Sequence, residues 1–343
     1  MSETGRPGEE VYRRAGVDLE AASRAVDLIR HVAVDASRAE VHTGVGGFAG
    51  LVDLGDGRLL AASTDGVGTK LDIARRVGKL DTVGIDCVAM CANDVVCTGA
   101  EPLFFLDYVA VEKLVPEEVA AIVSGVAEGC RQAGCALLGG ETAEHPETLP
   151  AGSFDLAGFC VGIVRRDDVL DPGRVRPGDA LVGFGSSGLH SNGFSLVRRA
   201  IEEAGLDLEA VLPELGRTLG EELLEPTSIY VRPALELIGA GLVRSAAHVT
   251  GGGLLENLPR ALPDGLGALV ETSAWTPQPV FDLVARAAGV QPRDLFGVLN
   301  MGIGFVVVTR PSDADEAVGR AKDSGWEAWV MGEVREGSGI LLQ

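Results

Sequence analysis

Positive charge is scarce in this sequence. The 343 residues include 29 lysines and arginines against 50 aspartates and glutamates, which gives a formal net charge of -21. A surface this acidic repels nucleic acid and anionic lipid, so neither is an expected partner. It also repels anionic substrates at long range. Any phosphate site must therefore be built locally from backbone N–H groups, metal ions and a few basic side chains.

Paired cysteines and long apolar runs are missing as well. The six cysteines lie between positions 87 and 160 and show no C-x-x-C spacing. This argues against a zinc site and a disulfide framework, and it predicts buried, reduced thiols. The first ten residues lack the apolar core of a signal peptide, and no run is long enough to span a bilayer. We therefore expect a cytoplasmic protein with no membrane partner.

What is present is a mixture of helix and strand patterns in two halves. A chain of this length suggests two domains. The turn signals Asp171-Pro-Gly173 and Pro177-Gly-Asp179 favour a boundary near residue 168. Both halves combine apolar runs typical of strands with stretches of helical spacing. The sequence predicts an α/β (or α+β) fold with two mixed domains, residues 1–168 and 169–343.

The expected elements follow from these patterns. In the first half we expect helices near 17–34, 83–98 and 116–133, and strands near 59–63, 103–111, 136–138 and 156–164. In the second half we expect helices near 192–204, 227–240, 279–288 and 312–324, and strands near 180–184, 246–250, 267–271, 303–309 and 327–334. The helix that opens at Pro116 has acids in its first turn and Gly134 where a C-terminal cap belongs.

The segment Ser63–Lys70 places a carboxylate, two glycines, a hydroxyl and an ammonium directly after a predicted strand. Glycines let backbone N–H groups approach phosphate oxygens, Lys70 supplies a cation, and Asp65 can hold Mg²⁺. The spacing is not that of a Walker A loop. The alternative is a tight turn with a surface lysine, and the segment alone does not decide between the two.

The stretch from Gly84 to Thr98 predicts a helix that carries polar groups on one face. Asp86, Asn93 and Asp94 stand at i, i+7 and i+8 and therefore share that face. Their neighbours are apolar nearly all round, which is typical of a buried helix. Buried carboxylates need a cation, so this pattern favours metal binding over a narrow solvated stripe.

Further loops combine glycine with polar groups. Glu141 follows a short apolar strand, where α/β proteins gather ligands. The loop Gly185–Gly193 precedes a predicted helix and contains His190, which makes it a candidate anion site with a candidate acid or base. A histidine that only caps the helix is the alternative. His248 precedes Gly251–Gly253, whose bare backbone suggests close approach by a phosphate or a ribose.

Together these motifs resemble the phosphoribosylformylglycinamidine cyclo-ligase (AIR synthetase) family of purine biosynthesis. The resemblance consists of long stretches in the same order, from near the N-terminus almost to the C-terminus. The stretches are Tyr12–Asp18, Ser63–Lys70, Gly84–Asp94, Gly99–Tyr108, Gly139–Glu144, Ala157–Gly162, Gly185–Leu196 and Ala247–Glu256.

The resemblance implies a fold, an assembly and a reaction. Each subunit would have two α/β domains, and N-terminal strands of two subunits would join in a barrel-like sheet, which implies a homodimer. The implied cofactors are ATP, bound near the Gly-rich N-terminal segments, and Mg²⁺. The implied reaction converts formylglycinamidine ribonucleotide and ATP to 5-aminoimidazole ribonucleotide, ADP and phosphate, by phosphorylation of the amide oxygen.

The site residues follow from the motifs that match. The candidate metal ligands are Asp65, Asp94 and Glu141. The candidate nucleotide- and phosphate-binding residues are Gly46, Gly47, Thr64, Gly66, Gly68, Thr69, Lys70, Asn192, Gly251, Gly252 and Gly253. The candidate catalytic residues are Asp65, Asp94, His190 and His248, with either histidine as the base for the proton lost on ring closure.

Two positions depart from the family pattern. His145–Leu149 stands where the family has Met-Pro-Gly-Met-Tyr, and Met301 stands where some members have cysteine, which excludes a catalytic thiol there. Selenophosphate synthetase fits less well because residues 1–86 lack its reactive cysteine. Thiamin-monophosphate kinase and the larger amidine synthetase are also rivals, although no long insertion or glutaminase partner is evident. A nucleotide-binding regulatory module without turnover is a further alternative, which two buried metal carboxylates argue against.

Overall fold

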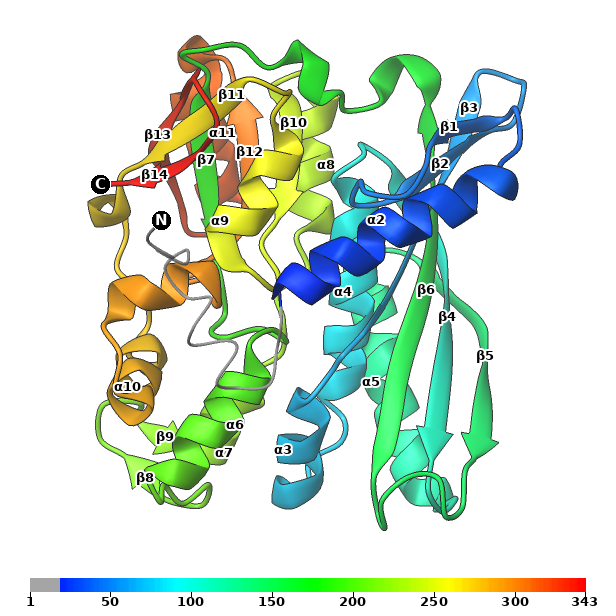
Figure 1. Cartoon of the computed structure of the whole chain (residues 1–343), viewed down its shortest axis with the longest axis vertical. Coiled ribbons are helices and arrows are strands. Elements are labelled where there is room, and N and C mark those ends of the chain that lie inside the picture. The colour runs from blue at the N-terminus through cyan, green and yellow to red at the C-terminus, as the bar shows by residue number, and fades with distance from the viewer. Residues whose placement is uncertain (1–18) are drawn as a thin grey trace.

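Two mixed sheets organise the chain (Figure 1). The structure is a computed structural model that describes residues 19–343, so the Tyr12–Asp18 stretch lies outside the described residues. The first sheet has the strand order β1-β2-β3-β6-β4-β5 and the second β10-β12-β7-β13-β11-β14. This confirms the predicted class of two mixed α/β units. The first sheet ends at Arg165 and the second begins at Ala180, and the boundary at residue 168 stays a prediction within that connection.

The first half holds a long helix, a helical layer and the first sheet. Its strands are β1 (Val41–Thr43), β2 (Gly50–Asp53), β3 (Arg58–Gly66), β4 (Glu101–Val111), β5 (Ala136–Glu144) and β6 (Phe154–Arg165). Its helices are α2 (Leu19–Asp35), α3 (Lys70–Val77), α4 (Val83–Val96) and α5 (Pro116–Ala133). Within this open sheet β4 and β5 run parallel, and the other neighbours are antiparallel.

The second half is built on the second sheet and a separate pair of short strands. Its strands are β7 (Ala180–Gly185), β8 (Val211–Leu212), β9 (Arg217–Thr218), β10 (Val243–His248), β11 (Leu266–Val270), β12 (Ile303–Thr309), β13 (Ala328–Glu336) and β14 (Gly339–Leu342). Its helices are α6 (Phe194–Glu203), α7 (Leu219–Leu223), α8 (Val231–Gly239), α9 (Gly253–Asn257), α10 (Pro279–Ala288) and α11 (Ala314–Asp323). Every residue of β12 is buried, as its uninterrupted apolar sequence predicts.

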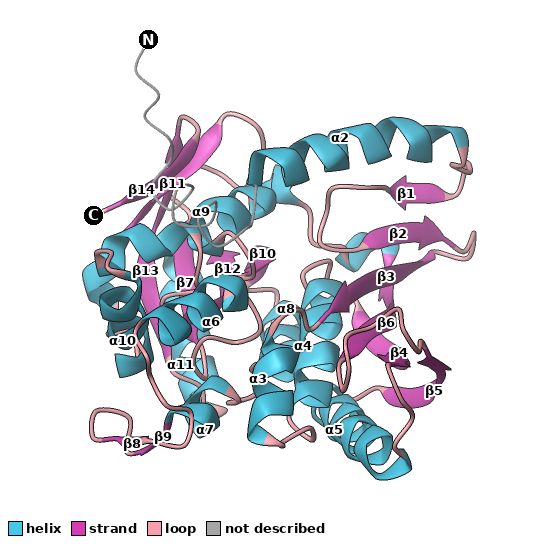
Figure 2. Cartoon of the chain, turned by 60° about the horizontal axis from the view of Figure 1, so that its bottom comes forward, coloured by secondary structure: helices cyan, strands magenta, loops and turns pink. Residues whose placement is uncertain are grey.

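Helices α4 and α5 cover one face of the first sheet and leave the other face open (Figure 2). Side chains alternate between the two faces along each strand. On β6, Leu156 and Cys160 are buried beneath the helices, whereas Phe159 is 39% exposed on the opposite face. Tyr108 on β4 is 42% exposed on that same open face. The first sheet thus displays aromatic side chains that no element within residues 19–343 covers.

The helix α5 begins and ends where its sequence signals predict. Pro116 stands in its first turn, where the missing N–H is no loss, and Glu117 and Glu118 follow. Gly134 takes the left-handed conformation at φ 77°, and the cap N–H bonds the carbonyl of Cys130. Both predicted helix signals are therefore confirmed.

Strand β5 is longer than its sequence pattern predicts. We expected a strand at 136–138 followed by a loop, but the strand continues through Gly139 and Gly140 to Glu144. The reason is its partner: β4 pairs with β5 in parallel as far as Val111 opposite Glu144, and this ladder satisfies the backbone despite the two glycines. Glu141 therefore lies within an exposed edge strand.

Two expected absences can be compared with the structure. Across residues 19–343 there is no helix with the length and hydropathy that a membrane crossing requires. The six cysteines are free thiols, and all but the half-buried Cys135 are buried, as predicted.

Candidate active site

The carboxylates of Asp65 and Asp94 come together where β3 ends against α4. Burial raises the pKa of Asp65; the N–H of Gly66, 2.7 Å from Asp65 Oδ1, opposes this rise and the negative charge of Asp94 adds to it. Ser63 Oγ lies 3.5 Å from Asp94 Oδ2, a long contact that leaves this oxygen weakly bonded. Two hard oxygen ligands thus share a partly buried space, which is the chemistry that Mg²⁺ takes.

The second half of the chain reaches this pair through His248, the last residue of β10. Its Nδ1 lies 2.9 Å from Asp94 Oδ1, and its Nε2 lies 3.4 Å from Asn93 Nδ2 on α4. The imidazole is fully buried. The predicted site residues Asp94 and His248 are therefore in direct contact, although 154 positions separate them.

Lys70 lies in a different environment from the one its motif predicts. Its side chain is fully buried, and its ammonium donates to Asp86 Oδ1 at 2.9 Å and to the carbonyls of His190 and Glu225 at 3.1 and 2.7 Å. Burial lowers the pKa of this ammonium, and the charge of Asp86 opposes that shift. An ammonium has three donors, and all three are occupied here. In this structure the Lys70 ammonium joins the two halves of the chain.

Asp86 completes the same buried cluster. Besides Lys70, its Oδ1 accepts from the backbone N–H of Thr227 at 2.7 Å and from the hydroxyl of Thr227 at 2.6 Å. The three residues of the predicted polar face of α4 therefore have different partners: Asp86 binds Lys70, whereas Asn93 and Asp94 contact His248.

His190 is buried in a strained turn between β7 and α6. Its φ is 61°, in the left-handed region that costs a non-glycine residue energy. Its Nε2 accepts from the backbone N–H groups of Ser187 and Ser228 at 3.2 and 3.4 Å, and its Nδ1 has no hydrogen-bond partner. Burial lowers the pKa of His190 well below its ordinary value, and the positive charge of Lys70 adds to this. The ring is therefore neutral, with its accepting nitrogen already occupied.

The three glycines after β10 are shaped by packing. Gly252 and Gly253 have φ of 87° and 58°, and a Cβ at Gly253 would lie 2.2 Å from the carbonyl of Phe296. Asn257 donates to the carbonyls of Gly251 and Gly253 and holds the turn. Only Gly251 is exposed, so it is the residue of the three that a ligand can approach.

The Gly-rich loop before β2 packs against a basic residue of the second half. Arg260 donates to the carbonyl of Gly47 at 2.9 Å, and its guanidinium lies 3.9 Å from the ring centroid of Phe48. The loop and Arg260 border a cavity of about 170 Å³ between the two halves. A Cβ at Gly46 would lie 2.5 Å from Arg30 Nη2, so this glycine permits a close side-chain approach.

The remaining predicted phosphate residues are spread around the end of β3. Thr64 donates its hydroxyl to the carbonyl of Gly158 at 2.8 Å, and Asn192 Nδ2 lies 3.6 Å from the sulfur of Met90. Gly68 and Thr69 border a second cavity, of about 300 Å³, which Arg75 and Arg198 also line, each bound to Asp72. Gly66 takes part in the turn through its bond to Asp65.

Glu141 does not join the other two acids within one chain. It pairs with Tyr108 across the sheet, and two strands, β4 and β6, separate its strand from β3. At about 4.8 Å between strands this is roughly 14 Å. Its neighbour Gly140 faces Asp107 on the helix-covered side, so Glu141 faces the open side. Among residues 19–343 no three His, Cys, Asp or Glu side chains are grouped to hold a metal.

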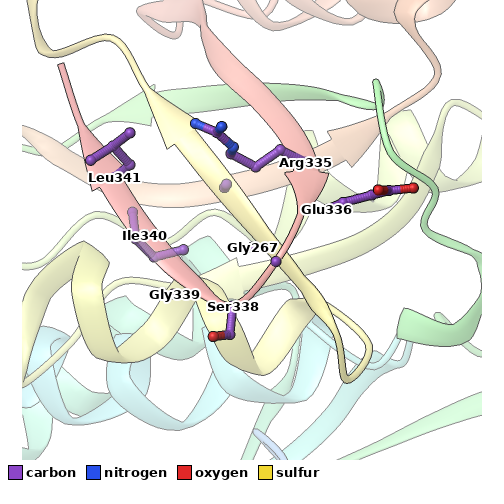
Figure 3. A pocket seen from close by; sticks show the side chains of 9 residues that line it. Gly267, Arg335, Glu336, Ser338, Gly339, Ile340 and Leu341 are labelled. Atoms are coloured by element: carbon purple, nitrogen blue, oxygen red, sulfur yellow. The ribbon is translucent and has the colours of Figure 1, made fainter.

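A pocket far from these groups lies at the edge of the second sheet (Figure 3). Its volume is about 380 Å³, and it is bordered by β11, β13 and β14. Arg335 and Glu336 point in different directions there, and Gly267, Gly337 and Gly339 are among the lining residues. It contains none of the predicted site residues, so we do not assign the chemistry to it.

Comparison with known proteins identifies the family. The model of the AIR synthase related protein N-terminal domain matches residues 46–164, and the model of the C-terminal domain matches residues 176–342. The chain belongs to the AIR synthase related family. A phosphoribosylformylglycinamidine cyclo-ligase of Geobacillus sp. (strain WCH70) is 47% identical over 336 residues, which covers 96% of this chain and 97% of the relative. The cyclo-ligase of Bacillus cereus (strain G9842) is 48% identical with the same coverage.

Solved structures share the AIR synthase related fold at low sequence identity. Thiamine-monophosphate kinase from Stenotrophomonas maltophilia K279a aligns with a TM-score of 0.64 at 20% identity and covers 92% of this chain and 94% of that one. T. maritima PurL complexed with FGAR aligns with a TM-score of 0.62 at 22% identity, over 88% of this chain and 46% of that one. At these identities the likeness shows the fold alone.

Two arginines that lie beside predicted Gly-rich segments were not among the residues predicted from the sequence. Arg260 and Arg198 each stand beside a predicted Gly-rich segment, although neither is near it in sequence. The available signal was the scarcity of bases: in so acidic a chain, an arginine soon after a Gly-Gly-Gly turn or just inside a helix is a candidate anion ligand.

Proposed function

We propose that this chain closes the imidazole ring of 5-aminoimidazole ribonucleotide from formylglycinamidine ribonucleotide, with ATP converted to ADP and phosphate. The observation that carries the proposal is the match to cyclo-ligases at 47% identity over 96% of the chain. The contact of Asp94 with His248 and the nearby Asp65 supports it, because these matching motifs converge at one place.

The chemistry requires activation of an amide oxygen, which is a poor leaving group. Transfer of the γ-phosphoryl group to that oxygen releases ADP and gives an iminophosphate. An amidine nitrogen then attacks the same carbon, phosphate leaves, and one proton is lost. Such a transfer depends on positioning and charge neutralisation more than on covalent help from the protein. The exposed glycine backbone and the neighbouring arginines are suited to hold the phosphates.

Asp65 and Asp94 would hold Mg²⁺ in this site. Their oxygens are hard ligands and they lie close together, and burial together with the charge of Asp94 raises the pKa of Asp65, which a bound cation would offset. Mg²⁺ is usually held by one or two carboxylates together with phosphate oxygens and water, so two acids suffice. When bound, the ion would neutralise charge on the transferred phosphoryl group.

We also propose that the chain acts as a homodimer through the open face of the first sheet. Phe159 and Tyr108 expose large aromatic side chains there, and the long edge strand β5 is itself unpaired on its outer side among the described residues. Phe159→Glu should give a monomer in size-exclusion chromatography with light scattering. Val330→Glu, at an equally exposed apolar position of β13, should leave the mass unchanged. A monomeric wild-type protein would contradict the assembly.

The function is tested by supplying the purified protein with formylglycinamidine ribonucleotide, ATP and Mg²⁺. We expect one ADP for each aminoimidazole formed. Release of ADP with another acceptor, and none with this substrate, would overturn the assignment.

The metal assignment has its own test in Asp94→Asn. Loss of one ligand charge should lower the apparent affinity for Mg²⁺ and the rate, by about 10-fold or more. Asp167→Asn, at an exposed position on the connection between the sheets, is the matched control and should match the wild type. An unchanged Mg²⁺ dependence in Asp94→Asn would show that α4 does not supply a ligand.

A further inference from the structure

The side-chain amide of Asn93 is fixed in orientation by backbone groups of the second half. The N–H of Tyr230 donates to Asn93 Oδ1 at 2.8 Å, and Asn93 Nδ2 donates to the carbonyl of Ser228 at 2.9 Å. Asn93 is fully buried, so no solvent competes for these bonds. If the amide were flipped, its NH₂ group would face the N–H of Tyr230 and its oxygen would face the carbonyl of Ser228. The NH₂ group is therefore the part of Asn93 that faces His248.

This orientation determines the tautomer of His248. The amide nitrogen of Asn93 only donates, so His248 Nε2, at 3.4 Å, must accept. The carboxylate of Asp94 only accepts, so His248 Nδ1, at 2.9 Å, must carry the proton. The two constraints are independent, and both select the neutral ring with hydrogen on Nδ1.

We infer that His248 is a positioning residue that orients the Asp94 carboxylate, and that it is not the base of ring closure. The inference rests on the proposed function, in which Asp94 binds the metal ion. The accepting nitrogen of His248 faces the Asn93 amide at 3.4 Å, and the ring is fully buried, so a substrate proton has no open path to that nitrogen. Its Nδ1–H holds Asp94 Oδ1, which leaves Oδ2, bonded only weakly by Ser63, as the oxygen for the ion.

The contacts from Asn93 to His248 and from His248 to Asp94 also make the proposed metal ligand depend on the contact between the two halves. Asp94 and Asn93 stand on α4 of the first half, whereas His248 ends β10 and Ser228 and Tyr230 precede α8 in the second half. Figure 1 shows α4 beside α8. A carboxylate on a helix normally chooses among several rotamers. Here a side chain from the other half selects one of them, so docking of the halves pre-organises the ligand.

The test compares two replacements of His248 that each keep one of its bonds. Asparagine can place an N–H where Nδ1 lies, and glutamine can place a polar atom where Nε2 lies. Mn²⁺ binding is measured by electron paramagnetic resonance in the presence of a non-hydrolysable ATP analogue. We expect His248→Asn to bind Mn²⁺ within about 3-fold of the wild type, and His248→Gln to bind about 10- to 100-fold more weakly. Turnover should fall in the same order.

A base would behave differently. If both variants lost turnover while their Mn²⁺ affinities matched the wild type, His248 would act on the proton, and the inference would be overturned. If both variants lost Mn²⁺ affinity equally, the inference would also be overturned, since keeping the N–H that bonds Asp94 would then not preserve metal binding.

The tautomer of His248 can be measured directly in the wild-type protein, with no assay of activity. Long-range ¹H–¹⁵N spectra of the histidine-labelled wild type, assigned by the missing signal in His248→Asn, should show a neutral ring protonated on Nδ1. Protonation on Nε2 would overturn the inference. If the wild type did not close the ring but showed this tautomer and this order of Mn²⁺ affinities, the proposed function would fail and the role of His248 would stand.

Discussion

Replacing Lys70 by methionine separates two roles for this residue, phosphate binding and the joining of the two halves. Methionine nearly preserves the volume, so the change removes the charge and its three bonds without opening a large cavity. Asp86 then keeps only its two bonds from Thr227 and remains as a buried, unpaired carboxylate. Breaking a buried ion pair in this way costs about 3–5 kcal/mol.

That loss is large against the whole stability of a folded protein, which is about 5–15 kcal/mol. The assay is urea denaturation followed in two ways. Far-UV circular dichroism reports both halves, whereas fluorescence reports the second half because all three tryptophans lie there. We expect Lys70→Met to lower the free energy of unfolding by about 3–5 kcal/mol, and to separate the two transitions because the contact between the halves is weakened.

Two further variants make this result interpretable. Lys79→Met changes an exposed lysine just beyond the same helix α3 and should shift stability by less than about 0.5 kcal/mol. The double variant Lys70→Met/Asp86→Leu removes the orphaned charge and should recover about 1–4 kcal/mol. If Lys70→Met kept wild-type stability and lost only ATP affinity, the lysine would bind phosphate, as its motif predicts, and the structural reasoning would be refuted.

Two other predictions concern buried positions of the first half. Gly125→Ala in α5 should lower the free energy of unfolding by at least about 1–3 kcal/mol, because its methyl would lie 2.0 Å from the carbonyl of Asp81. Gly319→Ala is the control within α11, where an added Cβ would have no atom within 4 Å, and it should raise the free energy of unfolding by about 0.5–1 kcal/mol. If urea denaturation showed shifts of the same sign for the two variants, both predictions would be contradicted. Burial raises the pKa of the Asp107 carboxyl above its ordinary 3.8, so the folded state favours the protonated form. The stability that this preference contributes is complete below pH 3.8 and is lost as the pH rises through the raised pKa. Asp107→Asn should therefore gain stability over the wild type from acid to neutral pH, and a constant difference across that range would contradict this.

Much of the local structure follows from local signals. The limits of α5 are set by Pro116 and Gly134, and the buried character of α4 is evident from its apolar composition. These features depend on backbone geometry and hydrophobic spacing, which act within a few residues. Strand β5 was predicted too short because its last residues are held by pairing with β4 and not by their own propensity.

The roles of the polar residues divide in the same way. The motif at Ser63–Lys70 carried the right elements for a phosphate site, yet it contained no information on which of them would be buried by the other half. The Lys70 ammonium binds the carboxylate of Asp86 and the carbonyls of His190 and Glu225, which stand 16, 120 and 155 positions away. The spacing of residues within the motif cannot predict contacts with such distant positions. The same is true of His248, whose tautomer is set by Asn93 and Asp94 on a helix of the first half.

The amino-acid sequence alone determined the fold class, the acidic surface, the reduced cysteines and the family, because composition, periodicity and motif order are properties of the chain itself. Only the tertiary structure decided that Asp65 and Asp94 lie close together and Glu141 lies apart, that Lys70 links the halves, and that His248 donates to a carboxylate. Those outcomes depend on distances between segments far apart in the chain, because hydrogen bonds and buried ion pairs form only once packing has brought the groups together.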